Sequence, residues 1–174
     1  MNEGDGKMAK AKYQFEDFLT TVPDECRDFV LDVHKAMLEE NYKPKITVTK
    51  STGLQLAYHQ PVIKTVAGRI LIFYLHHDKL MVRLDGKHHK QYSDVIDELP
   101  EELVSQIDKA EDCVKFVNPE KCWTGCKGYE LDIRGDRYQK CIVQCFQFVV
   151  EGKNMPYLLK LIESESKARS LNGV

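Results

Sequence analysis

Hydrophobic residues change their spacing several times along the chain, and each change marks a different predicted element. Between residues 13 and 40 the apolar positions recur every three or four residues, which is typical of amphipathic helices. The pattern predicts a short helix over 13–20, followed by a helix of about four turns. Cys26, Phe29 and Val33 lie on the apolar face of this second helix.

From residue 45 to residue 84 the apolar period becomes two, as in strands that bury one face. Segments 45–49, 54–59, 69–76 and 80–84 follow one another with short breaks. The third segment is apolar on both faces, which is typical of a central strand. Strands in series joined by short turns predict an antiparallel meander.

Helical spacing returns over 92–117, where Pro100 marks the start of a second helix. Segments 129–133 and 138–150 then alternate around a turn and predict a hairpin, and a last helix begins near Pro156. The order of elements predicts an α+β protein, in which helices cover an antiparallel sheet made of a four-strand meander plus a C-terminal hairpin.

The chain has 174 residues and a net charge of −2, which fits one ordinary globular domain. We expect a flexible N-terminal extension over 1–12 and a single domain over 13–174, with 113–150 as a cysteine-bearing loop and hairpin. No apolar run reaches the ~20 residues that a membrane helix needs, and the first residues carry no apolar signal core. These features predict a soluble, cytoplasmic protein with no membrane association.

The strongest chemical signal comes from the cysteines. Cys122 and Cys126 are separated by three residues, as are Cys141 and Cys145, and the two pairs are fourteen residues apart. Two close pairs on separate segments are typical of structural zinc, which takes four thiolate or imidazole ligands in a tetrahedron. A closed shell of four thiolates would make the ion a structural cofactor rather than a catalytic one.

The spacing of the second pair raises a geometric objection. In an extended strand Cys141 and Cys145 would face the same side but lie about 13 Å apart, too far for one zinc ion. Either a bulge or turn interrupts the strand, or only one of the two is a ligand, with Cys113 in reserve. Free thiols that are partly buried, or a disulfide or redox pair, are the alternatives to zinc at these positions.

The small net charge conceals a segregation of charge along the chain. Residues 41–90 carry a net charge of +7, whereas residues 13–40 carry −6 and residues 91–112 carry −7. The basic segment suggests a sheet face or turn that accepts an anion. Its densest part is the candidate anion site, formed by Arg83, Lys87, His88, His89 and Lys90. The alternative is that the sheet and the helices simply offset each other's fields.

Motifs of the common enzyme classes are absent from the sequence. There is no phosphate-binding loop, no dinucleotide-binding glycine pattern, no nucleophile elbow and no zinc-protease helix. This absence favours a binding protein over an enzyme.

Three stretches of the chain form a recognisable set. They are the opening Phe15-Glu-Asp-Phe-Leu, the pair Lys121-Cys122, and the positions Gly128, Tyr129, Ile133, Gly135, Tyr138, Lys140 and Cys141. Together they resemble a group of small uncharacterised cysteine-containing proteins from anaerobic Firmicutes. The resemblance covers most of residues 13–166. It implies a bacterial protein in which the four paired cysteines form one motif, and it assigns no activity.

The sequence thus predicts a small binding protein, for a small ligand, an anion or a protein partner, with a zinc site formed by cysteines. A thiol-based redox sensor or oxidoreductase is the first alternative, and a depressed thiol pKa would favour it. A nucleic-acid accessory protein that uses segment 41–90 is the second alternative, but the segment has few exposed aromatic residues for stacking on bases.

Overall fold

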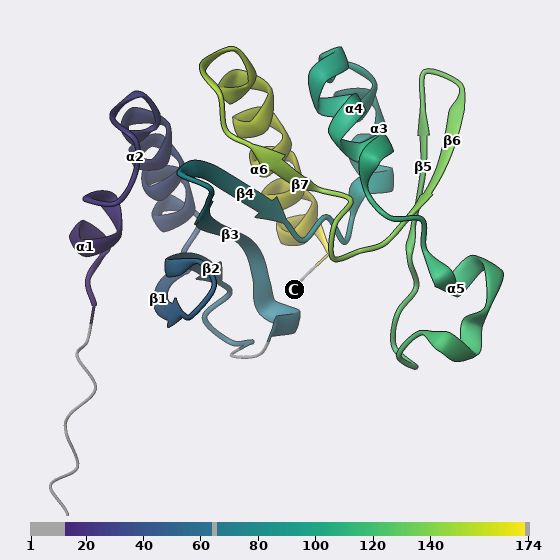
Figure 1. The fold of residues 1–174 in the computed structure, drawn as a ribbon, viewed down its shortest axis with the longest axis horizontal. Helices are drawn as coiled ribbons and strands as arrows, with labels where there is room; N and C mark the ends of the chain where they lie inside the picture. Colours follow the sequence, from purple (N-terminus) through teal and green to yellow (C-terminus); the bar gives the residue numbers. More distant parts are fainter. Residues whose placement is uncertain (1–12, 64–65, 173–174) are drawn as a thin grey trace, which may run out of the picture.

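The computed structural model describes residues 13–63 and 66–172 (Figure 1), so the extension predicted over 1–12 lies outside the described residues. The strands are β1 (Lys43–Thr49), β2 (Gly53–His59), β3 (Arg69–His76), β4 (Lys79–Leu84), β5 (Tyr129–Ile133), β6 (Asp136–Lys140) and β7 (Gln147–Val149). The α-helices are α1 (Phe15–Leu19), α2 (Asp24–Glu39), α3 (Ser93–Asp97), α4 (Glu101–Lys109), α5 (Val114–Val117) and α6 (Met155–Leu171). The predicted α+β class is confirmed.

The four predicted strands of the meander form β1 to β4, which pair with their chain neighbours in antiparallel register. The turn between β3 and β4 consists of His77 and Asp78, both with positive φ values of 48° and 60°. Two consecutive residues in the left-handed region form the tight hairpin turn whose twist matches that of the flanking strands. The short connection therefore fixes the register of the two central strands.

One face of the sheet packs against the helices. Figure 1 shows α2, α6, α3 and α4 on the same side of the sheet. The residues beneath them, such as Leu56, Phe73, Val82 and Phe148, are at most 1% exposed and belong to one hydrophobic core. Cross-strand pairing places these four side chains in a single row, because directly opposed residues share a face.

The predicted long strand over 138–150 is wrong in one respect, because a turn divides it. β6 pairs with β5 and ends at Lys140, whereas β7 joins β4 as the fifth strand of the main sheet. In between, the amide of Cys145 donates to the carbonyl of Cys141 at 2.9 Å, which closes a single helical turn. The turn carries the chain from the hairpin to the main sheet.

The helical region predicted over 92–117 is also divided. α4 begins after Pro100, as predicted, but ends at Lys109. Asp112 then forms an isolated bridge with Lys140 before the short helix α5 begins. Of the helices in the described residues, none is long and apolar enough to cross a membrane.

Candidate metal centre: a cysteine lobe beside the hairpin

A short backbone pairing brings Cys113 and Cys141 together. The amide of Cys113 donates to the carbonyl of Gln139 at 2.8 Å, and the amide of Cys141 donates to the carbonyl of Glu111 at 2.9 Å. Cys141 thus lies opposite Glu111, which is two residues before Cys113. Residues two apart in an extended segment share a face, so both thiols lie on the same side of the pairing.

The chain after Cys113 leaves this pairing and returns with two more cysteines. Residues 113–128, which we call the cysteine lobe, contain α5 and a single 3-10 turn over Pro119–Lys121. The thiol of Cys126 lies near enough to those of Cys113 and Cys122 to raise the pKa of both. Thiols from three segments therefore gather at the base of the lobe, and they belong to Cys113, Cys122, Cys126 and Cys141.

The cysteine lobe has no apolar interior of its own. No residue from Val114 to Gly125 is buried, and even Val117 and Trp123 are 87% and 61% exposed. The buried residues of the lobe are Cys113 and Cys126, each 3% exposed. Sulfur atoms therefore occupy the place that aliphatic side chains fill in an ordinary folded segment.

A glycine allows the backbone to pass close to the Cys113 thiol at one position. Gly128 has a φ of +68°, and a Cβ atom there would lie 2.5 Å from the ring of Phe116 and 2.9 Å from Sγ of Cys113. A side chain at Gly128 would displace the Cys113 thiol as well as strain the backbone.

Burial and neighbouring thiols raise the pKa values of two cysteines in the lobe. Burial raises the pKa of Cys113, and the neighbouring thiols of Cys126 and Cys141 raise it further. Desolvation and the neighbouring thiol of Cys126 raise the pKa of Cys122. All six cysteines are free thiols. Among the described residues, no group of three or more His, Cys, Asp or Glu side chains is arranged so that it could hold a metal ion. The thiols are neighbours, but they do not form a finished coordination shell.

Cys145 lies in the hydrophobic core. It is fully buried and packs with the core residues of the main sheet. Burial raises its pKa far above the ordinary value for a thiol. The helical turn that begins at Cys141 turns Cys145 toward the core. The thiol of Cys141 thus interacts electrostatically with those of both Cys113 and Cys145, and Cys145 differs in that it is buried in the hydrophobic core.

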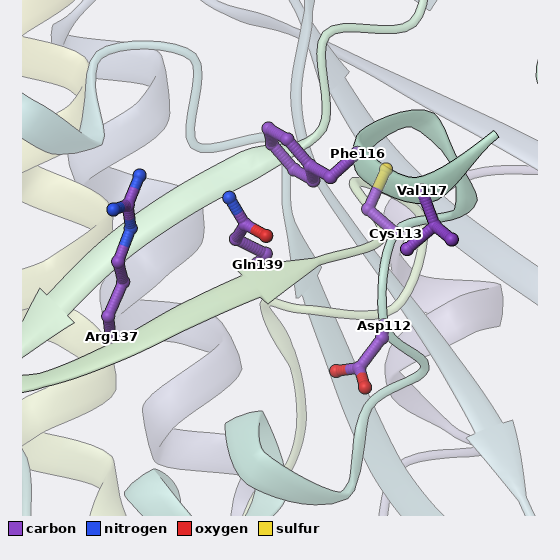
Figure 2. A pocket seen from close by; sticks show the side chains of 6 residues that line it. All are labelled: Asp112, Cys113, Phe116, Val117, Arg137 and Gln139. Carbon is purple, nitrogen blue, oxygen red and sulfur yellow. The ribbon is translucent and has the colours of Figure 1, made fainter. Parts of the chain in front are cut away.

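A cavity of about 360 Å³ opens beside Cys113. Figure 2 shows its lining, in which α5 provides Phe116 and Val117 while β6 provides Arg137 and Gln139.

The five residues of the candidate anion site do not form one patch. Arg83 lies on β4 with its side chain 22% exposed and contacts Asp85 at 3.4 Å. The ammonium of Lys87 donates to the carbonyl of Ala67. His89 is buried, and its ring nitrogens lie 3.0 Å from two backbone carbonyl oxygens.

The remaining two residues, His88 and Lys90, flank His89 in the chain. The side chain of His88 is half-buried, and its backbone amide donates to Glu165 at 3.1 Å. Lys90 is exposed and lines a separate cavity of about 610 Å³ between α3 and β5, together with His89 and Arg137.

Sequence reasoning missed a buried charged network under the loop after β4. The carboxylate of Glu165 is 0% exposed and accepts hydrogen bonds from the amides of Lys87 and His88, at 3.1 Å each, and from Tyr92 at 2.7 Å. Arg169 completes it with an ion pair of 2.7 Å. The sequence does place Glu165 and Arg169 four residues apart on the last predicted helix, a spacing that allows an ion pair. The same spacing is common on solvent-exposed faces of helices, so it did not indicate burial.

Comparison with known proteins supplies no relative, since no family model, no curated protein and no solved structure matches the chain. The fold and the site define an α+β protein with a thiol cluster at the base of a surface lobe.

Proposed function

We propose that the cysteine lobe binds one zinc ion through the thiolates of Cys113, Cys122, Cys126 and Cys141. The observation that carries this proposal is that buried thiols are the interior of a lobe which buries no other side chain between Val114 and Gly125. A segment without a hydrophobic core needs another source of stability, and four zinc–sulfur bonds provide it. The ion is structural, and the protein acts as a binding protein rather than as an enzyme.

Positive charge around the lobe supports thiolate ligands. Zinc with four thiolates carries two negative charges, and the lobe contains Lys115, Lys121 and Lys127. Within the described residues, none of these three lysines has an ion-pair partner. They are therefore available to offset the charge of the metal centre, and no separate cation is required.

The thiol-based redox alternative is less well supported. A reactive thiol needs a lowered pKa so that the thiolate is present at neutral pH. The pKa values of Cys113 and Cys122 are instead raised by burial and by neighbouring thiols. A zinc ion removes this obstacle, because coordination deprotonates the thiol directly. Free thiols throughout the chain fit the reducing cytoplasm, which is the compartment we propose.

The test combines metal content with thiol reactivity on freshly purified protein. We expect about one zinc per chain, and four thiols that become reactive only after denaturation with a chelator. Alanine at Cys113 or Cys126 should abolish stoichiometric zinc. Alanine at Cys145 or Cys26 is the matched control, since both are buried in the hydrophobic core.

Two outcomes would contradict the proposal. The first is full zinc occupancy in Cys113→Ala together with its loss in Cys145→Ala, which would restore the ligand set expected from the sequence. The second is wild-type protein with no metal, six freely titrating thiols and reversible loss of two thiols under mild oxidant. That result would establish the redox function instead.

A further inference from the structure

The cavity between α3 and β5, which we call the hairpin cleft, is large enough for a small ligand. Its volume is about 610 Å³, and ligand sites range from roughly 300 to 1,000 Å³. Figure 1 shows α3 beside the hairpin of β5 and β6. Most of the lining is accessible to solvent, since Lys90, Ser93, Asp97, Asp132 and Arg137 are all exposed. A ligand in the hairpin cleft therefore meets charged and polar side chains that it can reach in the folded chain.

One wall of the hairpin cleft is a strand edge that no other described strand covers, because β5 pairs with β6 alone. In antiparallel pairs, residues that exchange backbone hydrogen bonds alternate with residues that do not. The carbonyl of Gln139 accepts from the amide of Cys113, away from β5. Gln139 lies opposite Glu130, and Asp132 follows two residues later in the same register. The backbone amides and carbonyls of Glu130 and Asp132 therefore point away from β6, toward the cleft.

The protein itself occupies both ends of this strand edge. The Nε2 atom of His89 lies 3.0 Å from the carbonyl oxygen of Glu130. At the other end, the amide of Arg134 donates to the carboxylate of Asp97 at 2.9 Å. Between them, the backbone amide and carbonyl of Asp132 have no partner within the part of the chain that the structure describes. A free donor and a free acceptor on one edge residue are what an added extended peptide uses.

Charge changes sign along the hairpin cleft. Lys90 follows His89, which contacts the start of β5, so Lys90 marks a basic end. Asp97 contacts the residue just after β5, and together with Asp132 it marks an acidic end. Over residues 13–63 and 66–172, none of Lys90, Asp97 and Asp132 has an ion-pair partner. The cleft is thus complementary to a ligand with a carboxylate at one end and an ammonium at the other.

The arginines beside the cleft have carboxylate partners of their own. Arg137 contacts Glu130 at 2.6 Å, and Arg134 contacts Glu101 at 3.3 Å. Each guanidinium is therefore engaged by a glutamate. The carboxylates of the two aspartates remain for a cationic group of a ligand.

We infer that the hairpin cleft binds a short extended peptide with free termini. The main chain of the peptide pairs with Asp132, its carboxylate with Lys90, and its ammonium with the two aspartates. Charge fixes an antiparallel direction, because the C-terminus of an antiparallel strand lies at the start of β5. The edge from Glu130 to Arg134 spans about 13 Å, which suits about three residues. The inference does not depend on the proposed zinc site, since no cysteine lines the cleft.

The test uses trialanine as the probe on the full chain and follows the backbone amide of Asp132 by NMR. We expect a saturable shift of this amide. Binding should be at least about tenfold weaker for each of three altered peptides: N-acetyl-trialanine, trialanine amide, and trialanine with an N-methyl group on the central residue. The first two each lose one terminal charge, whereas the third keeps both charges and loses only the central main-chain donor.

Two variants test the direction of the peptide. Lys90→Gln should weaken trialanine by a factor similar to that of amidation and leave trialanine amide nearly unaffected. Asp132→Asn should weaken trialanine and leave the acetylated peptide nearly unaffected. Lys109→Gln is the matched control, because Lys109 is an exposed lysine at the end of α4 that does not line the cleft.

Three results would overturn the inference. They are no shift at millimolar trialanine, equal binding of the two blocked peptides, and equal binding of the N-methylated peptide. All three are measured on the wild-type chain, so they decide the matter even if a variant fails to fold. The zinc content of the same samples is measured separately, so failure here leaves the metal proposal standing.

Discussion

At the scale of single residues, Glu165 is the charged side chain whose burial requires the most hydrogen-bond partners. It is fully buried, as is the adjacent Arg169, which is 1% exposed. Burial of two opposite charges is tolerated only when the remaining hydrogen-bonding groups are satisfied. Here Tyr92 and two backbone amides donate to Glu165, while the guanidinium of Arg169 also donates to the carbonyls of Arg69 and Asp85. The pair holds the loop after β4 against α6.

Replacement of this carboxylate should be costly. Glu165→Gln leaves Arg169 as an uncompensated buried charge, and we expect a loss of about 3–5 kcal/mol of unfolding free energy in urea titration. Glu98→Gln is the matched control, since the same chemical change affects an exposed pair with Lys160, with 61% and 50% of the two side chains exposed. That variant should cost less than about 1 kcal/mol. Equal effects of both changes would show that the buried network does not stabilise the fold.

At the scale of elements, the connection from β6 to β7 determines which cysteines meet. Lys140 ends β6 with a nearly buried side chain, whose ammonium donates to the carbonyls of Asp108 and Ala110 at 2.7 and 3.0 Å. This contact fixes the end of the hairpin against the end of α4. The helical turn that follows then directs Cys145 to the core and leaves Cys141 beside the lobe.

Gly128 offers a test of the lobe as an element. Gly128→Ala places a methyl group against Phe116 and the Cys113 thiol, so we expect at least about tenfold weaker zinc binding in competition with a chromophoric chelator. Gly53→Ala is the control, because Gly53 has a nearly equal φ of +64° but no atom within 4 Å of the added Cβ. Both variants bear similar backbone strain, about 1–2 kcal/mol. If Gly128→Ala retained wild-type zinc affinity, the close packing at Cys113 would have no part in metal binding.

At the scale of the whole molecule, the stability of the lobe and that of the main core have different sources. The core cluster draws on the helices, the main sheet and the hairpin, and none of its members lies between Ile107 and Tyr129. Loss of structure in the lobe therefore removes little apolar contact from the rest of the chain. Such independence is typical of a unit that opens locally.

Removal of zinc should therefore unfold the cysteine lobe and leave the rest of the fold intact. After chelation we expect faster hydrogen exchange and new proteolytic cleavage within residues 113–128, with protection of β3 and β4 unchanged. The measurement is hydrogen exchange with mass spectrometry, before and after addition of chelator and after zinc is restored. Uniform loss of protection would mean that the metal supports the entire fold, and no change anywhere would mean that the lobe is stable without it.

Much of the architecture was determined by the sequence alone. Period-two alternation over 45–59 and 80–84, together with the continuous apolar run over 69–76, predicted the meander, because the strands bury their core face under helices. Period-three and period-four spacing fixed the helices for the same reason. Those patterns report which residues face the core, and burial against the core dominates the stability of a domain of this size. The basic character of the sheet was also visible, as a run of positive charge.

The tertiary structure decided which distant residues meet. The antiparallel pairing of residues 111–113 with residues 139–141 places Cys113 beside Cys141, and a single helical turn directs Cys145 into the hydrophobic core. Neither feature can be predicted from the spacing of apolar residues. The backbone pairing involves only three residues on each segment, and the helical turn is a single turn, so both are too short to show a period. The same holds for Asp85, whose carboxylate is contacted by both Arg69 and Arg83 in the folded chain. Local spacing fixes elements, but competition among side chains for partners is settled only when the chain is folded.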